Sequence, residues 1–181
     1  MIFILTFRNV KWGTKRYFKV KKLYLSAFPK NERFPFVGLL AMALQKRVNL
    51  QAVYDHDDFI GLIFWTYAEK IIYIGYLAVD PVWRGKGYGS QTLNLMKQHH
   101  PNQEIVLDIE PVIKTAKNYS QRSNRLLFYK HNGFKLTQDN LVDEGGHYAI
   151  LSSDKHFKKR NLSRLLKQMS FNCYKFKIVS K

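Results

Sequence analysis

Apolar residues recur along the chain with two different periods, which separate predicted helices from predicted strands. Apolar positions three or four residues apart between lysines, as at Tyr17, Val20 and Tyr24, are typical of a helix with one buried face. Runs rich in β-branched and aromatic residues between turn-like segments are typical of strands. The predicted helices cover residues 15–28, 36–47, 88–99, 123–132 and 157–169, and the predicted strands cover residues 1–7, 50–54, 59–67, 71–79, 104–110, 134–137 and 147–151.

The order of these elements predicts the fold class. The three strands between residues 50 and 79 follow one another through short turns, as in an antiparallel meander. The strand at 71–79 is then followed by a helix and the strand at 104–110, and a strand, helix, strand unit implies a parallel crossover. No repeat or linker marks a domain boundary. We therefore expect a single α/β (α+β) domain over residues 1–181, with a mixed, mostly antiparallel central sheet and helices on both faces.

The composition indicates a packed globule without a stabilising metal or disulfide. With 46% hydrophobic residues among 181, the chain can bury a sizeable core, which excludes a disordered or fibrous protein. Its one cysteine, Cys173, cannot form an intramolecular disulfide, and no Cys and His residues have zinc-ligand spacing. No run reaches the ~18 apolar residues that a membrane span needs. We expect a cytoplasmic protein with no metal and no membrane span.

The charge is strongly unbalanced. Lys and Arg outnumber Asp and Glu by 30 to 13, which gives a net charge of +17. The first 30 residues contain no acid, and residues 155–181, a predicted basic helix and strand, contain nine Lys or Arg and no acid. This distribution would steer nucleic acid, anionic lipid or a polyanionic coenzyme to the surface, and it is equally typical of a well-solvated lysine-rich surface. Nucleic-acid binding and membrane anchoring by the amphipathic helix 157–169 both stay open.

A glycine-rich turn follows the apolar strand at 71–79 and precedes the helix at 88–99. The turn consists of Arg84, Gly85, Lys86, Gly87, Tyr88, Gly89 and Ser90. A helix N-terminus offers unpaired N–H groups and partial positive charge, and glycines let a phosphate approach the backbone. The spacing fits neither a P-loop nor a dinucleotide fingerprint. The turn therefore predicts a pyrophosphate site of another kind.

The segment from Val79 to Gly89 resembles the acetyl-CoA motif of the GNAT superfamily of N-acetyltransferases, whose core pattern is Gln/Arg-x-x-Gly-x-Gly/Ala. A second family block, with an aromatic residue, a tyrosine and a final Gly-Phe, is matched by residues 128–134. The resemblance covers about residues 50–152. It implies that acetyl-CoA is the co-substrate and that its carbonyl and pantetheine bind backbone groups of Leu77, Ala78 and Val79.

The resemblance also implies roles for side chains on the helix at 123–132. Tyr129 matches the family tyrosine that faces the coenzyme sulfur and protonates the leaving thiolate. Arg122 and Arg125 stand where many members have an Asn and an Ala, so Asn124 or Asn118 is expected to replace the usual contact to pantetheine. The two arginines would alternatively add positive charge near the coenzyme phosphates.

Two carboxylates are candidates for the general base or amine anchor. Glu110 ends a strand at the edge where ligands collect in such sheets, and it is the first choice. Glu32 is the second choice, because residues 27–35 resemble the substrate-side loop of some bacterial GNAT proteins. Phe34 in the same loop is expected to contact the substrate.

Together these features predict an N-acetyltransferase that moves an acetyl group from acetyl-CoA to a primary amine, most simply that of a small molecule, by direct transfer in a ternary complex. The alternative is a non-catalytic protein of the same fold that binds nucleic acid or another polyanion through its basic termini. The sequence leaves open the amine acceptor, the acyl-chain preference and homodimer formation.

Overall fold

The computed structural model describes residues 4–180, so the first three residues of the strand expected at 1–7 lie outside the described part. The strands are β1 (Leu5–Asn9), β2 (Val48–Asp55), β3 (Asp58–Ala68), β4 (Ile71–Val79), β5 (Glu104–Ile109), β6 (Lys135–Asp143), β7 (Gly146–Ser152) and β8 (Phe176–Ser180). The helices are α1 (Lys15–Ala27), α2 (Phe36–Met42), α3 (Tyr88–His99), α4 (Tyr119–His131) and α5 (Lys159–Met169), and the 3-10 turns are η1 (Lys30–Glu32) and η2 (Pro81–Trp83).

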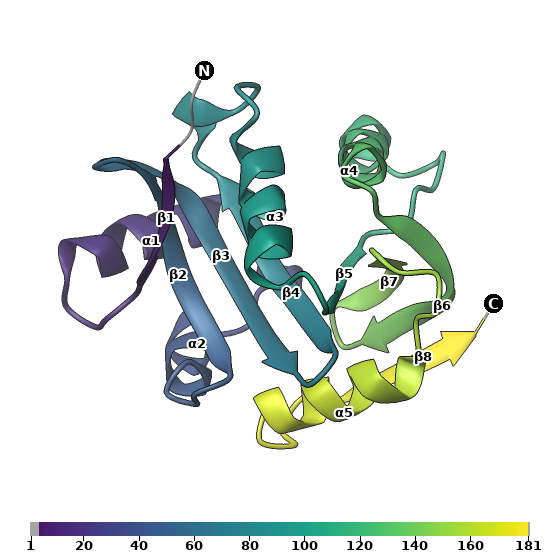
Figure 1. Ribbon diagram of the computed structural model, residues 1–181. Coiled ribbons are helices and arrows are strands. Elements are labelled where there is room, and N and C mark those ends of the chain that lie inside the picture. The colour runs from purple at the N-terminus through teal and green to yellow at the C-terminus, as the bar shows by residue number, and fades with distance from the viewer. Residues whose placement is uncertain (1–3, 181) are drawn as a thin grey trace. The chain divides into compact units, whose positions relative to one another are not determined.

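The strands form a mixed sheet in the order β1-β2-β3-β4-β5-β7-β6-β8, which confirms the predicted fold class (Figure 1). The pairs β1-β2, β2-β3, β5-β7, β6-β7 and β6-β8 are antiparallel. Between β4 and β5 the chain passes through α3, the crossover that joins parallel neighbours. The chain divides into two compact units, one of residues 1–67 and 74–101 and the other of residues 68–73 and 102–181. The single domain stays a prediction.

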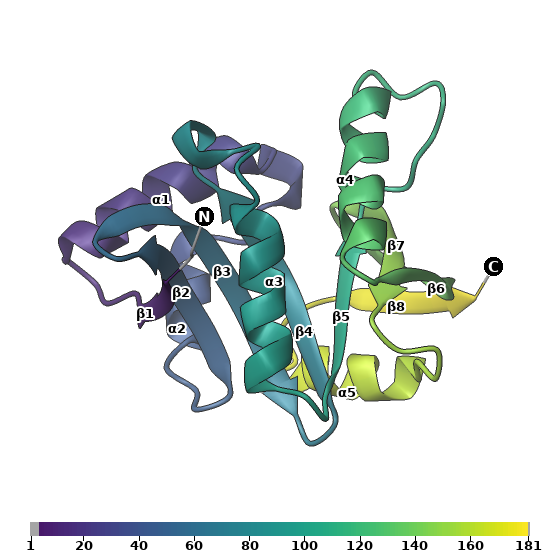
Figure 2. The same ribbon diagram turned by 45° about the horizontal axis from the view of Figure 1, so that its top comes forward.

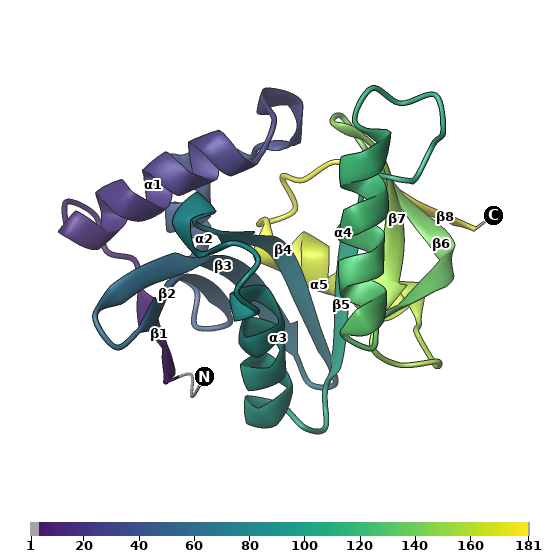
Figure 3. The same cartoon turned by 90° about the horizontal axis from the view of Figure 1, so that it is seen from above.

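In the first unit, α1 and α2 lie on one face of the strands and α3 lies on the other (Figures 1 and 3). Helix α1 begins where the Thr14 side chain accepts a hydrogen bond of 3.2 Å from the amide of Tyr17. Its inner face, which includes Tyr17, Val20 and Tyr24, is buried. The predicted apolar stripe is therefore the face that α1 packs on the core.

Helix α2 ends at Met42, five residues before the predicted end at Arg47. The apolar stripe stops there, because Leu44 is 88% exposed. Residues 43–47 instead form turns, with the amides of Leu44 and Gln45 bonded to the carbonyls of Ala41 and Met42. A helix over these residues would have gained no further buried surface.

In the second unit, α4 runs beside β5 and β7 (Figure 2). Helix α4 begins at Tyr119, four residues before the predicted start, and β6 continues to Asp143 instead of ending at residue 137. The part of β6 that the sequence pattern did not predict begins with polar residues, which lie at a register shift between Leu136 and Asn140. The sequence pattern is weak at such an irregularity because the alternation of faces is interrupted.

Helix α5 has the predicted amphipathic pattern. Leu162, Leu165, Leu166 and Met169 are all buried, whereas the basic residues of the helix are exposed. The apolar stripe is thus already covered by protein, so α5 does not offer it to a membrane. Within residues 4–180, no helix is long and apolar enough to cross a membrane.

Candidate active site

The glycine-rich turn follows β4 and η2 and continues into the first turn of α3, as far as Ser90. The Asp80 side chain accepts a hydrogen bond of 3.2 Å from the amide of Val82 and thereby fixes the start of η2. Gly85 and Gly87 have φ values of +74° and +85°, in the left-handed region that favours glycine. Gly87 is the N-cap of α3 and has no side chain to cap it. The first amides of α3 therefore face an exposed turn, as an anion site requires.

Two cations flank this turn. The Nε of Arg84 donates a hydrogen bond of 3.0 Å to the carbonyl of Val79, so the side chain folds back on the end of β4. The Nζ of Lys86 lies 4.6 Å from the ring centre of Trp83. Both side chains are exposed. They add positive charge to the amides of the helix start, while Gly89 and Ser90 lie half-buried in its first turn.

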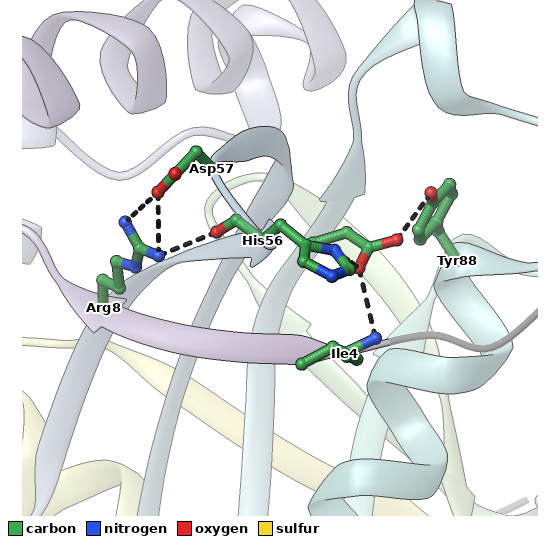
Figure 4. A network of polar contacts seen from close by, with 6 residues as sticks. Ile4, Arg8, His56, Asp57 and Tyr88 are labelled. Carbon is green, nitrogen blue, oxygen red and sulfur yellow. Dashed lines mark hydrogen bonds and ion pairs between the residues drawn. The ribbon is translucent and has the colours of Figure 1, made fainter.

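Tyr88 has a structural role that the sequence did not reveal. Its side chain is 4% exposed, and its hydroxyl donates a hydrogen bond of 2.9 Å to Oδ2 of Asp55 at the end of β2 (Figure 4). Oδ1 of Asp55 accepts a hydrogen bond of 3.1 Å from the amide of Ile4. Only the backbone of Tyr88 is therefore available to a ligand in this arrangement, because the ring anchors α3.

A second contact, from Arg8 on β1, holds the turn between β2 and β3, which follows Asp55. Arg8 donates a hydrogen bond of 2.7 Å to the carbonyl of His56 and lies 3.4 Å from Oδ1 of Asp57 (Figure 4).

Burial alone would raise the pKa of Asp55, but the hydrogen bonds from Tyr88, the Ile4 amide and His56 outweigh it and lower that pKa. Burial and the Asp55 carboxylate both raise the pKa of Tyr88.

The segment of Leu77, Ala78 and Val79 is closely approached by β3. A Cβ on Gly61 would lie 2.2 Å from the carbonyl oxygen of Ala78, so only glycine fits there. The amide of Asp80 donates a hydrogen bond of 2.8 Å to the carbonyl of Ile60. A glycine inside an otherwise apolar run is the one sequence signal that could have marked this close approach.

The loop with Glu32 and Phe34 is fixed to β4 and α1 by two tyrosines. The hydroxyl of Tyr76 donates a hydrogen bond of 2.9 Å to the carbonyl of Glu32 and accepts one of 3.0 Å from the amide of Phe34. The hydroxyl of Tyr24 donates one of 2.9 Å to the carbonyl of Phe34. Both predicted substrate residues are thus held at Tyr76, the residue before the Leu77 to Val79 segment.

In the second unit, Glu110 is surrounded by hydrogen-bond donors from the start of α4. Its carboxylate lies 2.5 Å from Nη2 of Arg122 and 3.3 Å from Nη1 of Arg125. The Asn118 amide donates to it at 3.2 Å, while Oδ1 of Asn118 accepts from Arg122 at 2.7 Å. The two arginines and Asn118 are therefore committed to Glu110, and of the two expected asparagines only Asn124 lies exposed on α4.

Tyr129 is the buried residue of α4, with 8% of its surface exposed. Leu127 on the same helix is 51% exposed. Burial raises the pKa of Tyr129 to about 12, with Arg125 acting to lower it and Asp108 to raise it. Asp108 itself accepts a hydrogen bond of 2.6 Å from Tyr73. The phenol of Tyr129 is accordingly protonated at neutral pH.

Among residues 4–180, no group of three or more His, Cys, Asp or Glu side chains is arranged to hold a metal ion. The first unit brings together the turn, the end of β4 and the loop of Glu32 and Phe34, and the second unit holds Glu110, Asn124 and Tyr129.

Comparisons with known proteins give a family match for part of the chain and similar folds for most of it. Residues 48–136 match the model of the acetyltransferase (GNAT) domain. A putative GNAT-family acetyltransferase from Bacteroides thetaiotaomicron has a similar structure, with a TM-score of 0.74, 20% identity and coverage of 93% of this chain and 98% of that one. A search among curated protein sequences found no significant match.

Two further solved structures share the fold. Naa50 from Arabidopsis thaliana, in complex with the bisubstrate analogue CoA-Ac-MVNAL, has a TM-score of 0.58, 23% identity and coverage of 83% of this chain and 98% of that one. A GNAT family acetyltransferase from Elizabethkingia anophelis with acetyl-CoA bound has a TM-score of 0.55, 16% identity and coverage of 83% and 97%. Residues 48–136 thus carry the acetyltransferase domain of the GNAT superfamily.

Proposed function

We propose that this protein is an acetyl-CoA-dependent N-acetyltransferase that acts on a primary amine of a small molecule. The observation that supports it most directly is the start of α3, where Gly85 and Gly87 adopt left-handed φ values and the first helical amides face an exposed turn. With Arg84 and Lys86 beside it, this turn has the charge and shape to hold a pyrophosphate. The acetyl-CoA and bisubstrate complexes of similar structures agree with the proposal.

The proposed reaction is a direct transfer. The amine nitrogen attacks the thioester carbonyl carbon, a C–N bond forms and the C–S bond breaks, which leaves an acetamide and the coenzyme thiolate. Backbone groups of Leu77, Ala78 and Val79 would bind the carbonyl and the pantetheine. One group must take a proton from the amine and another must give a proton to the thiolate.

We propose Tyr129 as the proton donor to the thiolate. Its pKa of about 12 keeps the phenol protonated at neutral pH, so it has a proton to give. The phenolate would be the stronger base, because a thiol has a usual pKa of about 8.5, so the phenol would stabilise the departing thiolate by donating a hydrogen bond to it. Complete transfer would need the proton released by the amine to replace the one that the phenol gives up. Asn124, exposed on the same helix, is the proposed contact to pantetheine.

The proposed proton acceptor is Glu32 or Glu110, and the ion pairs of Glu110 together with the position of Glu32 favour Glu32. The carboxylate of Glu110 already accepts hydrogen bonds from Asn118, Arg122 and Arg125, which occupy the lone pairs that a base needs. Glu32 is fixed through its backbone to Tyr76, beside the strand segment that is proposed to hold the thioester. We propose that Glu32 accepts the proton and Phe34 contacts the amine substrate, while Glu110 holds the start of α4.

Isothermal titration calorimetry with acetyl-CoA tests the proposal. We expect the wild type to bind and Gly87→Val to lose binding, because a β-branched side chain cannot adopt the left-handed φ of +85° at the helix start. Gly13→Val is the matched control, since Gly13 has a φ of +75° but lies in the loop before α1, with nothing within 4 Å of its added Cβ. Absence of binding by the wild type would refute the proposed function.

A further inference from the structure

The outward face of α1 carries large apolar side chains that the fold does not use. Phe18 is 60% exposed and Leu25 is 46% exposed, and they lie seven residues apart on one side of the helix. Trp12, in the turn before α1, is 69% exposed. The opposite face of the helix, with Val20 and Leu23, is already buried. The core therefore gives no reason for apolar residues on the outward face.

Ring contacts join these side chains into one surface. The ring centres of Trp12 and Tyr17 are 5.0 Å apart, and those of Tyr17 and Phe18 are also 5.0 Å apart. Leu25 extends the same side of α1 by two turns. We call this surface, together with the exposed lysines between and beside these residues, the α1 patch; it comprises Trp12, Phe18, Leu25, Lys11, Lys15, Lys19 and Lys22.

The α1 patch is purely basic. Its four lysines are exposed, and the nearest acidic residue that follows in the sequence is Glu32. Across residues 4–180, none of these four lysines forms an ion pair. The Nζ of Lys19 lies near an aromatic ring, 5.9 Å from the ring centre of Phe59. The α1 patch therefore combines lysines without ion pairs and exposed apolar side chains, which together match an anionic partner that also accepts apolar groups.

We propose that the α1 patch docks this protein reversibly on the surface of an anionic phospholipid membrane. Lysines next to exposed Trp, Phe and Leu side chains are typical of interfacial binding, in which the cations meet lipid phosphates and the apolar groups enter the headgroup region. A second copy of the chain would bring like charges together. A nucleic acid offers phosphates, but it has no site for Leu25, which cannot stack on a base as an aromatic ring can.

Helix α5 provides an internal comparison. It is equally basic, with Lys158 before it and Arg164 and Lys167 within it, all exposed. The apolar side chains of the helix itself are buried, however, and the exposed apolar group beside it is Phe171, 59% exposed in the turn after the helix. The exposed face of α5 thus has charge without the apolar side chains that Phe18 and Leu25 add to the face of α1.

Co-sedimentation of the full-length protein with vesicles tests the proposal. We expect binding to phosphatidylcholine vesicles that contain phosphatidylserine, weaker binding as salt is raised, and no binding to pure phosphatidylcholine. Trp12 should move into a less polar environment, so its fluorescence should shift to the blue with anionic vesicles, and the shift should be lost in Trp12→Phe. Failure of the wild type to bind anionic vesicles would overturn the proposal.

Charge-reversed variants locate the surface. Lys15→Glu/Lys19→Glu/Lys22→Glu should lower the partition coefficient by on the order of 100-fold, since each cation near an anionic leaflet contributes roughly a fivefold factor. Lys158→Glu/Arg164→Glu/Lys167→Glu changes the net charge equally and should retain most of the binding. Equal loss in both triple variants would show that net charge alone acts and would reject the α1 patch.

Removal of the apolar groups distinguishes the membrane from a nucleic acid. Phe18→Ser/Leu25→Ser keeps every lysine and should lower vesicle binding by on the order of 10-fold. Leu25→Ser should not change the affinity of the protein for a single-stranded DNA oligonucleotide. If the wild type binds the oligonucleotide in a lysine-dependent way but not the vesicles, the partner is a nucleic acid and the membrane proposal is wrong. The melting temperature of each variant is measured to check that the variant is folded.

Discussion

The phenolic hydroxyl of Tyr88 donates a hydrogen bond of 2.9 Å to Oδ2 of Asp55, which joins the first residue of α3 to the last residue of β2 (Figure 4). The same carboxylate accepts from the amide of Ile4 beside β1. Three elements that are distant in the sequence thus meet at Asp55. Because α3 begins with the proposed pyrophosphate site, Asp55 helps to set the direction in which the amides of that site point.

Replacing Asp55 by Asn should lower both stability and coenzyme affinity. Loss of the charge-assisted hydrogen bonds should destabilise the protein by about 1–3 kcal/mol. The native pKa of Asp55 lies below its unfolded value of about 3.9, so its contribution is present above about pH 4 and disappears as the pH falls through the native pKa. The difference in melting temperature between wild type and Asp55→Asn should therefore be constant near pH 6 and shrink below about pH 4.

Asp57→Asn is the matched control for this prediction. The Asp57 side chain is 99% exposed and pairs only loosely with Arg8, so its replacement should change the melting temperature by less than about 1 °C. Thermal unfolding followed by circular dichroism from pH 3 to 7 measures both variants. A difference between wild type and Asp55→Asn that grows on acidification would contradict the assigned direction of the pKa.

Gly61→Ala should disturb the end of β4. The added Cβ would lie 2.2 Å from the carbonyl oxygen of Ala78, so β3 and β4 must move apart. We expect a loss of about 1–3 kcal/mol in the free energy of unfolding, as for other overpacked sites, and weaker acetyl-CoA binding. Gly13→Ala, in open space at a φ of +75°, carries only the backbone penalty and should bind acetyl-CoA normally. Wild-type affinity in Gly61→Ala would exclude the Ala78 segment from the coenzyme site.

Glu32→Gln and Glu110→Gln should differ in their pH–rate profiles. If Glu32 accepts the proton, Glu32→Gln should lower turnover by on the order of 10²-fold or more, most at low pH, with partial recovery as the pH rises and more amine is neutral. Glu110→Gln leaves Arg122 and Arg125 without their counter-charge, so the melting temperature should fall while the profile keeps its wild-type shape.

The opposite pattern would reassign these two carboxylates. If Glu110→Gln alone changes the shape of the profile, Glu110 is the base and the sequence-based first choice is correct. Steady-state turnover measured from pH 6 to 10 by release of the coenzyme thiol provides the comparison once an amine acceptor is found by screening.

Tyr129→Phe should lower turnover by on the order of 10²-fold, the usual scale for losing a general acid, without changing acetyl-CoA affinity. Because the pKa of Tyr129 is about 12, loss of its proton should not limit the wild-type rate below that pH. Tyr119→Phe is the control, since Tyr119 lies on the same helix and is 38% exposed. Full activity in Tyr129→Phe with a lower melting temperature would assign Tyr129 to packing alone.

Local sequence patterns predicted the elements whose signals are repeated or chemically distinctive. Helices α1, α3 and α5 each have an apolar face at helical spacing, and β4 is a long apolar run, so their types followed directly from periodicity. The turn from Arg84 to Ser90 was recognisable because glycines at a helix start are typical of phosphate sites. Element ends were less predictable, as at Met42 and Tyr119, because packing decides how far a helix continues.

The sequence by itself determined the fold class, the glycine-rich turn at a helix start and the resemblance to the GNAT superfamily, because each depends on local patterns and their order along the chain. Tertiary structure alone decided which of the candidate side chains hold others in place. Tyr88 became an anchor through Asp55, 33 residues away, and Glu110 became the partner of two arginines on α4. Gly61 gained its importance from a carbonyl on the neighbouring strand. Such roles depend on contacts between residues far apart in the chain, and no local pattern records them.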